Sequence, residues 1–514
     1  MQTWKLKLPL LRYSLLSFLL GLSMSAHADS PLADTIKSGD RQSALAMIRA
    51  GADVNEPQND GTTPLHWAVY QVDPELVATL LRSEAGANVS NAFGASPLSQ
   101  AARVANPDMV AMLLDAGADP DMANSDGQTP LMLAAWTGVV EVAELLINHG
   151  ADVNAEEIWT GQSALMWAAS RNHAGMAELL IASGADVHVR ARTFDWERQI
   201  TSEPRNQYRP AGGLTALLYA SRSGCLRCVQ AIIEAGADVD MPTPEGVTPL
   251  IVAIDTFNFQ TAHFLLDAGA NPHTFDWWGR TPLYTAIDVR TIESRGQRIG
   301  PEAQEAALEL ARRLLDRGVY VDPVLNFGRP GQGGGNGRFA DEHLSTGTTP
   351  LLRAAVSHDF DAVSLLLGYD AAVDLPNIFG ATPLIVASGL ATPRGMLSDG
   401  SVYSAPDVED RAINTLQRLL DAGADINARV TDTTSYTAFI PRHNAMTDRQ
   451  GQTAIYGPGK WGWMNVAKFL VVNGAEVNVT DFYGKTPADS ALAKAGGEQE
   501  EVWEELSNYL SNAN

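Results

Sequence analysis

The chain repeats itself with a period of 33 residues, and this period constrains its fold more than any local preference. Gly61, Gly94 and Gly127 each open a Gly-x-Thr/Ser-Pro-Leu turn motif. Variants of the motif begin later at Gly161, Gly213, Gly246, Gly279, Gly347, Gly380, Gly451 and Gly484. A second landmark, Gly-Ala-Asp-Val-Asn from Gly51, recurs at Gly86, Gly117, Gly150, Gly184, Gly236, Gly269, Gly423 and Gly474, and in degenerate form near Gly318 and Asp370. Units this short cannot bury a core alone, so neighbouring units must stack.

Each unit encodes two helices. Gly127 permits a tight turn, the Thr129 hydroxyl can cap a helix, and Pro130 suits the first helical position. Gly138 predicts the end of this first helix, and Gly150 predicts the end of the second. The stretch after the second helix leads to the next turn as an extended loop, called a finger below.

These motifs resemble the ankyrin repeat family, whose period is about 33 residues and whose signature is Thr-Pro-Leu-His. The resemblance covers about residues 30–510, although His66 is the one residue that matches the signature His. It implies an all-α solenoid of about twelve helix-turn-helix units with short β-turn fingers. The terminal caps are expected at 29–60 and 484–514, and the solenoid at 61–483. The resemblance also implies protein binding rather than chemistry.

Five insertions interrupt the period. Those at 188–212, 322–346 and 428–450 follow a second helix and are expected to enlarge fingers, whereas those at 290–304 and 390–410 separate the two helices of one unit. The glycine-rich stretch 331–337 lacks the Lys-Ser/Thr of a phosphate-binding loop.

Residues 1–28 are expected to be a secretory signal peptide. Basic residues precede an apolar run from Tyr13 to Met24, and Ala26-His27-Ala28 has the pattern of a cleavage site. The alternative is an uncleaved N-terminal anchor. The sequence therefore predicts an exported protein, periplasmic or secreted, without integral membrane association.

A formal charge of −24 disfavours nucleic acid as a partner, because phosphates attract Lys and Arg. The expected partner is a protein, its identity open, and the chain is expected to be monomeric until it binds. No cofactor or metal site is predicted, since the ten His residues are dispersed. The sequence contains no Gly-x-Ser-x-Gly elbow, no His-Glu-x-x-His zinc helix and no Gly-x-Gly-x-x-Gly after a strand.

Resemblance to ankyrin repeats implies that certain first-helix residues face a binding groove. These positions hold Trp67, Tyr70, Leu133, Trp136, Trp167, Tyr219 and Arg222. Exposed aromatic rows mark binding surfaces. The alternative is local packing against the next finger.

The 188–212 finger carries five Arg against three acidic residues, together with aromatic side chains. Arg190, Arg192, Trp196 and Arg198 are therefore predicted to contact the partner. The alternative is a finger folded back on acidic neighbouring repeats.

Cys225 and Cys228 are the two cysteines of the chain, and their spacing is Cys-x-x-Cys. In an oxidising envelope a local disulfide is favoured, with inert thiols and thioredoxin-like chemistry as alternatives. Three functions follow: a non-enzymatic scaffold in the cell envelope, an envelope thiol-disulfide oxidoreductase that uses Cys225 and Cys228, or an exported effector that binds host proteins.

Overall fold

The computed structural model describes residues 30–195, 210–290, 293–294, 297–298, 300–326, 346–390, 407–431, 449–493 and 500–513. The chain forms two compact units, which divide between Ser125 and Asp126. The expected signal peptide lies outside the described residues.

Twelve helix pairs run through the described residues, as the repeat predicts. The first unit contains the pairs α1 (Pro31–Lys37) with α2 (Arg41–Arg49), α3 (Pro64–Tyr70) with α4 (Pro74–Arg82), and α5 (Pro97–Arg103) with α6 (Pro107–Asp115). The second unit contains α7 (Pro130–Thr137) with α8 (Val140–Asn148), α9 (Ala164–Ser170) with α10 (Ala174–Ala182), α11 (Ala216–Ser223) with α12 (Leu226–Glu234), α13 (Pro249–Asp255) with α14 (Phe259–Asp267), α15 (Pro282–Val289) with α16 (Pro301–Asp316), α17 (Pro350–Val356) with α18 (Phe360–Gly368), α19 (Pro383–Ala387) with α20 (Val408–Asp421), η2 (Ala454–Tyr456) and α21 (Pro458–Trp461) with α22 (Met464–Val472), and α23 (Pro487–Leu492) with α24 (Glu500–Asn512).

The turn motif starts the first helices as the sequence predicts. The Thr129 hydroxyl accepts a hydrogen bond from the Met132 N–H at 3.3 Å, and Pro130 occupies the first turn. Gly138 ends α7 at a φ of 82°, a left-handed conformation that glycine adopts without strain.

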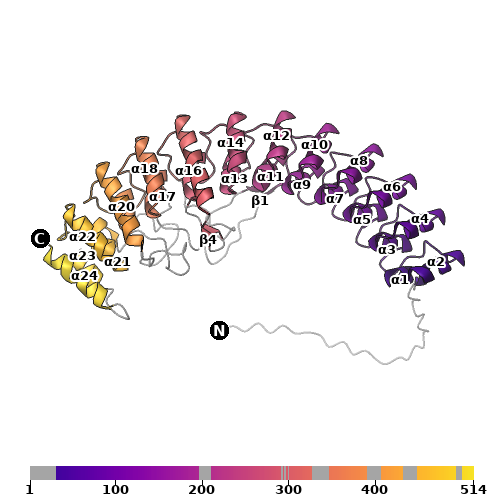
Figure 1. The fold of residues 1–514 in the computed structure, drawn as a ribbon, viewed down its shortest axis with the longest axis horizontal. Helices are drawn as coiled ribbons and strands as arrows, with labels where there is room; N and C mark the ends of the chain where they lie inside the picture. Colours follow the sequence, from indigo (N-terminus) through magenta and orange to yellow (C-terminus); the bar gives the residue numbers. More distant parts are fainter. Residues whose placement is uncertain are drawn as a thin grey trace, which may run out of the picture. The chain divides into compact units, whose positions relative to one another are not determined.

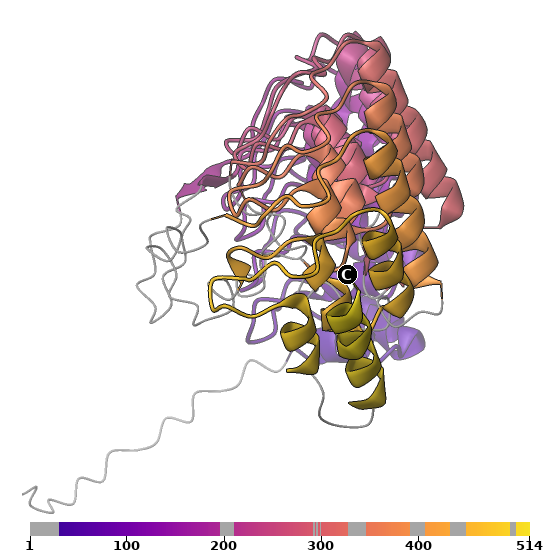
Figure 2. The same ribbon diagram turned by 90° about the vertical axis from the view of Figure 1, so that its left-hand side faces the viewer.

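In the second unit the first and second helices form two layers (Figure 1), and the fingers project together to one side of the helices (Figure 2). Small residues let neighbouring first helices approach closely: Ala134 and Ala135 on α7, and Ala168 and Ala169 on α9, are fully buried. Adjacent fingers are joined by backbone hydrogen bonds, as from the Ile158 N–H to the Asp126 carbonyl at 2.9 Å.

The insertions add small elements to this frame. In the 188–212 finger, β1 (Thr193–Asp195) pairs antiparallel with β2 (Pro210–Gly212), and Thr193 lies opposite Gly212. Between α15 and α16, β3 (Glu293–Ser294) pairs with β4 (Gln297–Arg298). The helices α16 and α20 begin at Pro301 and Val408, so the ends of the insertions expected at 290–304 and 390–410 are helical.

In several repeats a polar side chain after the second helix clamps the repeat to the next. Asn154 accepts a hydrogen bond from the Asp186 N–H at 2.8 Å, and its amide donates to the Gly184 carbonyl at 3.0 Å. Asn427 makes the same two bonds, to the Glu476 N–H at 2.9 Å and the Gly474 carbonyl at 3.2 Å. The first unit repeats the arrangement with Asn55 and Asn88. We call this side chain the inter-repeat clamp.

The clamp corrects one detail of the sequence analysis. Asn55 accepts a hydrogen bond from the N–H of Gly86. In the other repeats the clamp accepts from the third residue of the landmark, as Asn154 does from Asp186. Glu84 is the first residue of that landmark and adopts a left-handed φ of 66°. Gly86 is therefore the third residue of this landmark, and not its first as the sequence suggests.

Other clamps are aspartates, which accept the N–H but cannot donate while ionised. Asp240, Asp322 and Asp374 accept from the N–H groups of Asn271, Ala372 and Asp425. One carboxylate oxygen of Asp322 and one of Asp374 are buried without a hydrogen-bond donor in the described part of the chain. Burial raises the pKa of all three carboxyl groups.

We predict that Asp374→Asn stabilises the array. The new amide can donate to the Gly423 carbonyl, as Asn427 does to that of Gly474, and one such bond contributes about 1 kcal/mol. A carboxyl group whose pKa is raised on folding destabilises the fold most above that pKa, and the cost disappears as pH falls towards the unfolded value of about 3.9. Thermal unfolding should therefore show a gain at neutral pH that shrinks in acid.

The matched control is the reverse change, Asn427→Asp, which should lower the unfolding midpoint at neutral pH and recover in acid. An Asp374→Asn variant that is less stable than the parent at neutral pH would show that the ionised clamp is preferred.

Candidate functional site

Aromatic side chains of the first unit form a pair on one first helix. The rings of Trp67 and Tyr70 on α3 meet edge to face at a centroid distance of 5.6 Å. The indole N–H of Trp67 donates to the Gln58 side chain at 2.8 Å, and the Lys37 ammonium lies 4.9 Å from the Trp67 ring centroid. Trp67 is therefore half-buried and fixed by local contacts, whereas Tyr70 is 54% exposed.

A second cluster lies on the first helices of the second unit. Trp136 on α7 meets Trp167 on α9 edge to face, with ring centroids 5.5 Å apart. The guanidinium carbon of Arg171, which caps the end of α9, lies 3.3 Å from the Trp136 ring centroid. Trp136 is 46% exposed and Arg171 is exposed, so the cluster presents a flat aromatic ring covered by a cation.

The next first helix continues this surface with Tyr219 and Arg222. The Arg222 guanidinium carbon lies 5.0 Å from the Tyr219 ring centroid, and Arg222 is exposed. Tyr219 is only 8% exposed, and burial raises the pKa of its phenol. Tyr219 therefore fits the alternative of local packing better than direct contact with a partner. Its buried ring packs against Arg222.

We define the Trp–Arg face as Trp136, Trp167, Arg171, Tyr219 and Arg222. Sequence reasoning missed Arg171. Its signal was a position just beyond the end of α9, one turn from Trp167, where the chain leaves the helix.

Arg190 and Arg192, the arginines of the 188–212 finger that lie within the described residues, contact neighbouring segments, although not acidic residues. A side-chain N–H of Arg190 points at the Met241 sulfur at 2.6 Å, and the Arg192 guanidinium donates to the Ile158 carbonyl. The Arg192 backbone N–H donates to the Thr160 carbonyl at 2.6 Å. The finger therefore folds back on its neighbours here, while Trp196 and Arg198 lie outside the described residues.

A buried carboxylate organises the preceding finger. Glu157 accepts hydrogen bonds from the backbone N–H groups of Trp159 and Thr160, both at 2.7 Å. Burial raises its pKa, but these bonds and one from the Thr160 hydroxyl outweigh burial, so the net pKa is lowered. Glu157 stays ionised, and its carboxylate stabilises the turn by accepting these hydrogen bonds.

Further along the second unit, the motif positions that hold Trp136 and Trp167 carry charged residues that are buried in ion pairs. Arg353 on α17 and Asp288 on α15 are 2% and 0% exposed, and the Arg353 Nε lies 2.5 Å from the Asp288 carboxylate. Arg290 pairs with Asp359 at 2.6 Å, and Arg280 bridges Asp255 and Asp276. These charges are internal, which leaves the part of the face that runs from α7 to α11 open.

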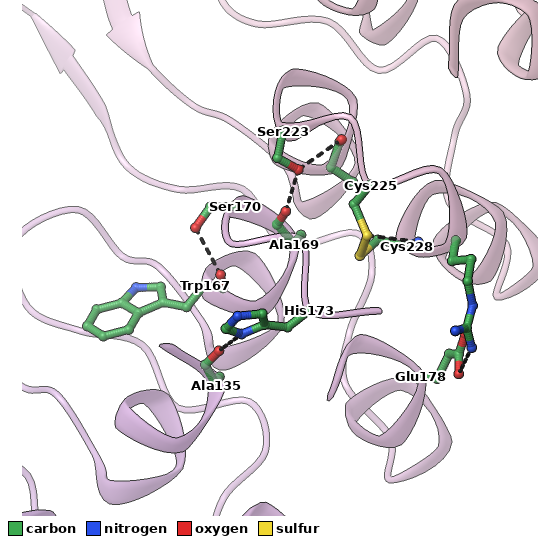
Figure 3. The surroundings of a disulfide bond; sticks show 11 residues. Ala135, Trp167, Ala169, Ser170, His173, Glu178, Ser223, Cys225 and Cys228 are labelled. Atoms are coloured by element: carbon green, nitrogen blue, oxygen red, sulfur yellow. Dashed lines mark hydrogen bonds and ion pairs between the residues drawn. A yellow bond between two sulfur atoms is a disulfide. The ribbon is translucent and has the colours of Figure 1, made fainter. Parts of the chain in front are cut away.

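Cys225 and Cys228 are joined in a disulfide with their Cα atoms 5.2 Å apart (Figure 3). Cys225 caps α12 and is 1% exposed, and Cys228 is 0% exposed. Trp167 points away from the disulfide, towards the opposite side of α9 (Figure 3). A thiol oxidoreductase must expose its attacking sulfur to substrate, so this burial speaks against that alternative.

The described residues contain no cluster of His, Cys, Asp and Glu that could hold a metal ion. Within the same ranges, no helix has the length and hydrophobicity that crossing a bilayer requires.

A model of ankyrin repeats in three copies matches residues 32–124, 98–191, 198–276 and 217–293. The chain is an ankyrin repeat protein. The matched segments cover the first helices that carry the Trp–Arg face. An array of this kind acts as a scaffold for protein–protein interaction.

Distant relatives share the repeats over part of their length. An ankyrin repeat protein of Fowlpox virus is 23% identical over 204 residues, which is 34% of this chain and 35% of the relative. The RelA-associated inhibitor of Mus musculus is 35% identical over 89 residues, 17% of this chain and 11% of the relative. The phosphocholine transferase AnkX of Legionella pneumophila is 22% identical over 272 residues, 53% of this chain and 23% of AnkX. The chain thus aligns with about a third of these relatives or less.

We predict that the disulfide is a local support of the ankyrin array and not a reactive centre. The double variant Cys225→Ser, Cys228→Ala keeps a hydroxyl at the helix cap and should lose at most about 2 kcal/mol of unfolding free energy, because the closed loop is short. Urea unfolding without reductant measures this change. Complete loss of the folded array would contradict a local role.

Proposed function

We propose that this ankyrin repeat protein is a non-enzymatic scaffold of the cell envelope that holds a protein partner against the Trp–Arg face. The observation that carries the proposal is the exposed Trp136 ring with the Arg171 guanidinium stacked on it. Trp and Arg are enriched among the few residues that contribute most of the binding energy of protein interfaces.

Neighbouring surfaces support this choice. Charged residues at the corresponding positions of α13, α15 and α17 are paired internally, so they have little left to offer a partner. The arginines of the 188–212 finger whose positions are described also make internal contacts. The Trp–Arg face therefore combines exposure with uncommitted charge.

We expect Trp136→Ala to abolish capture of the partner. Affinity capture from a native envelope extract should return one specific protein with the parent chain and lose it with Trp136→Ala, because the ring is the largest exposed anchor of the face. Trp277→Ala is the matched control, since Trp277 is 44% exposed but lies in a later finger. Equal capture by all three proteins would move the site elsewhere, and failure of the parent to capture anything would contradict the scaffold.

Export of the chain is the second part of the proposal. The signal-like segment 1–28 and the Cys225–Cys228 disulfide both support it, because disulfides persist in oxidising compartments. The effector alternative shares the export step and differs in destination.

We expect the mature chain to begin at Asp29 and to be found in the envelope fraction. Cys225 and Cys228 should be joined in the disulfide there and resist alkylation. N-terminal sequencing and alkylation of fractionated cells test this directly. Recovery outside the cell would favour the effector, and a cytoplasmic chain with reactive thiols would overturn export.

A further inference from the structure

Two guanidinium groups on the Trp–Arg face are uncommitted. Arg171 and Arg222 are exposed, and in the described part of the chain each contacts an aromatic ring without an ion pair to a carboxylate. By contrast, the exposed Arg227 on α12 pairs with Glu178 at 2.7 Å. What distinguishes Arg171 and Arg222 from other exposed arginines is that both lie against aromatic rings on neighbouring first helices.

Stacking prepares these groups for one kind of ligand. A guanidinium lying on a ring keeps its edge N–H groups free and has lost part of its rotational freedom, so it can form a two-pronged bond to a carboxylate. Trp136, 46% exposed, and the half-buried Trp167 that it contacts offer apolar surface beside Arg171.

The positions of the two cations on the helices set the spacing of the ligand groups. The Arg171 guanidinium lies over Trp136 of α7 and Arg222 lies on α11, with α9 packed between those two helices. Neighbouring packed helices lie about 8–10 Å apart, so the two cations are separated by one to two helix spacings, roughly 10–20 Å. Three to six residues of an extended or polyproline II chain span roughly that distance, so two carboxylates on one segment can reach Arg171 and Arg222 together.

We propose that the Trp–Arg face binds an extended acidic segment of the protein partner. The segment carries two Asp or Glu side chains three to six residues apart, with an aromatic or aliphatic residue between them. This inference rests on the proposed scaffold function and names the chemistry of its partner. The array as a whole is acidic and repels acidic chains, so a segment that matches the two cations and the rings of this face is favoured over other acidic chains.

The test uses a phage-displayed library of random peptides, about twelve residues long, selected on the full exported chain. We expect the selected peptides to be enriched in paired carboxylates three to six residues apart around an apolar residue. The double variant Arg171→Gln, Arg222→Gln should lose this enrichment, whereas Arg227→Gln, which removes an equally charged residue from α12, should keep it.

A synthetic peptide from the selection gives the quantitative arm. Its affinity should fall about tenfold with Arg171→Gln, Arg222→Gln, since two exposed ion pairs contribute about 0.7 kcal/mol each, and it should fall as salt is raised. Peptides without acidic enrichment, or with the same enrichment on the double variant, would overturn the acidic segment while leaving the scaffold intact. If the parent selects no peptide but still captures its partner through Trp136, the segment proposal alone fails. If it does neither, the scaffold fails too.

Discussion

The hydrogen bonds that cross from one repeat to the next are the interactions on which this structure depends. Each unit leaves backbone N–H and carbonyl groups at its landmark that its own residues do not satisfy, and the clamp side chain of the preceding unit satisfies them, as Asn154 does for Asp186 and Gly184. Backbone bonds between fingers add a second row of links. A unit of this size buries too little apolar surface alone, so it is stable only beside its neighbour, and the clamp bonds add to that stacking. At Asp240, Asp322 and Asp374 the ionised carboxylate accepts the N–H but has no proton to donate to the carbonyl, so these links have one bond fewer.

The same stacking creates the Trp–Arg face. Because the repeats hold successive first helices at a regular distance, residues at one position of the motif line up in a row. What each row does depends on the side chains that it carries. In α7, α9 and α11 the row presents rings and unpaired guanidinium groups, whereas in α13, α15 and α17 it holds Asp255, Asp288 and Arg353 in internal ion pairs. A single architecture thus produces an open binding surface and a closed one.

The sequence was sufficient for the architecture because turn chemistry repeats locally: Thr129, Pro130 and Gly138 act within one unit. It was less sufficient for the surface, which depends on contacts between units. Trp136 is exposed as the motif position implies, but Tyr219 at a similar position is covered by its neighbours. Arg171 was missed because its role comes from a ring on the preceding helix, and the landmark at Gly86 was misplaced because Glu84 adopts a conformation usual for glycine.

Site-specific photo-crosslinking in the source cells tests most directly where the partner binds. A photoreactive residue would replace Ser170 or Arg222 on the first-helix layer, and Glu144 or Glu234 on the second-helix layer, one position at a time. The account predicts that Ser170 and Arg222 each give an adduct with the same protein, and that Glu144 and Glu234 give none. Adducts formed from Glu144 or Glu234 alone would place the partner on the other layer and contradict the account.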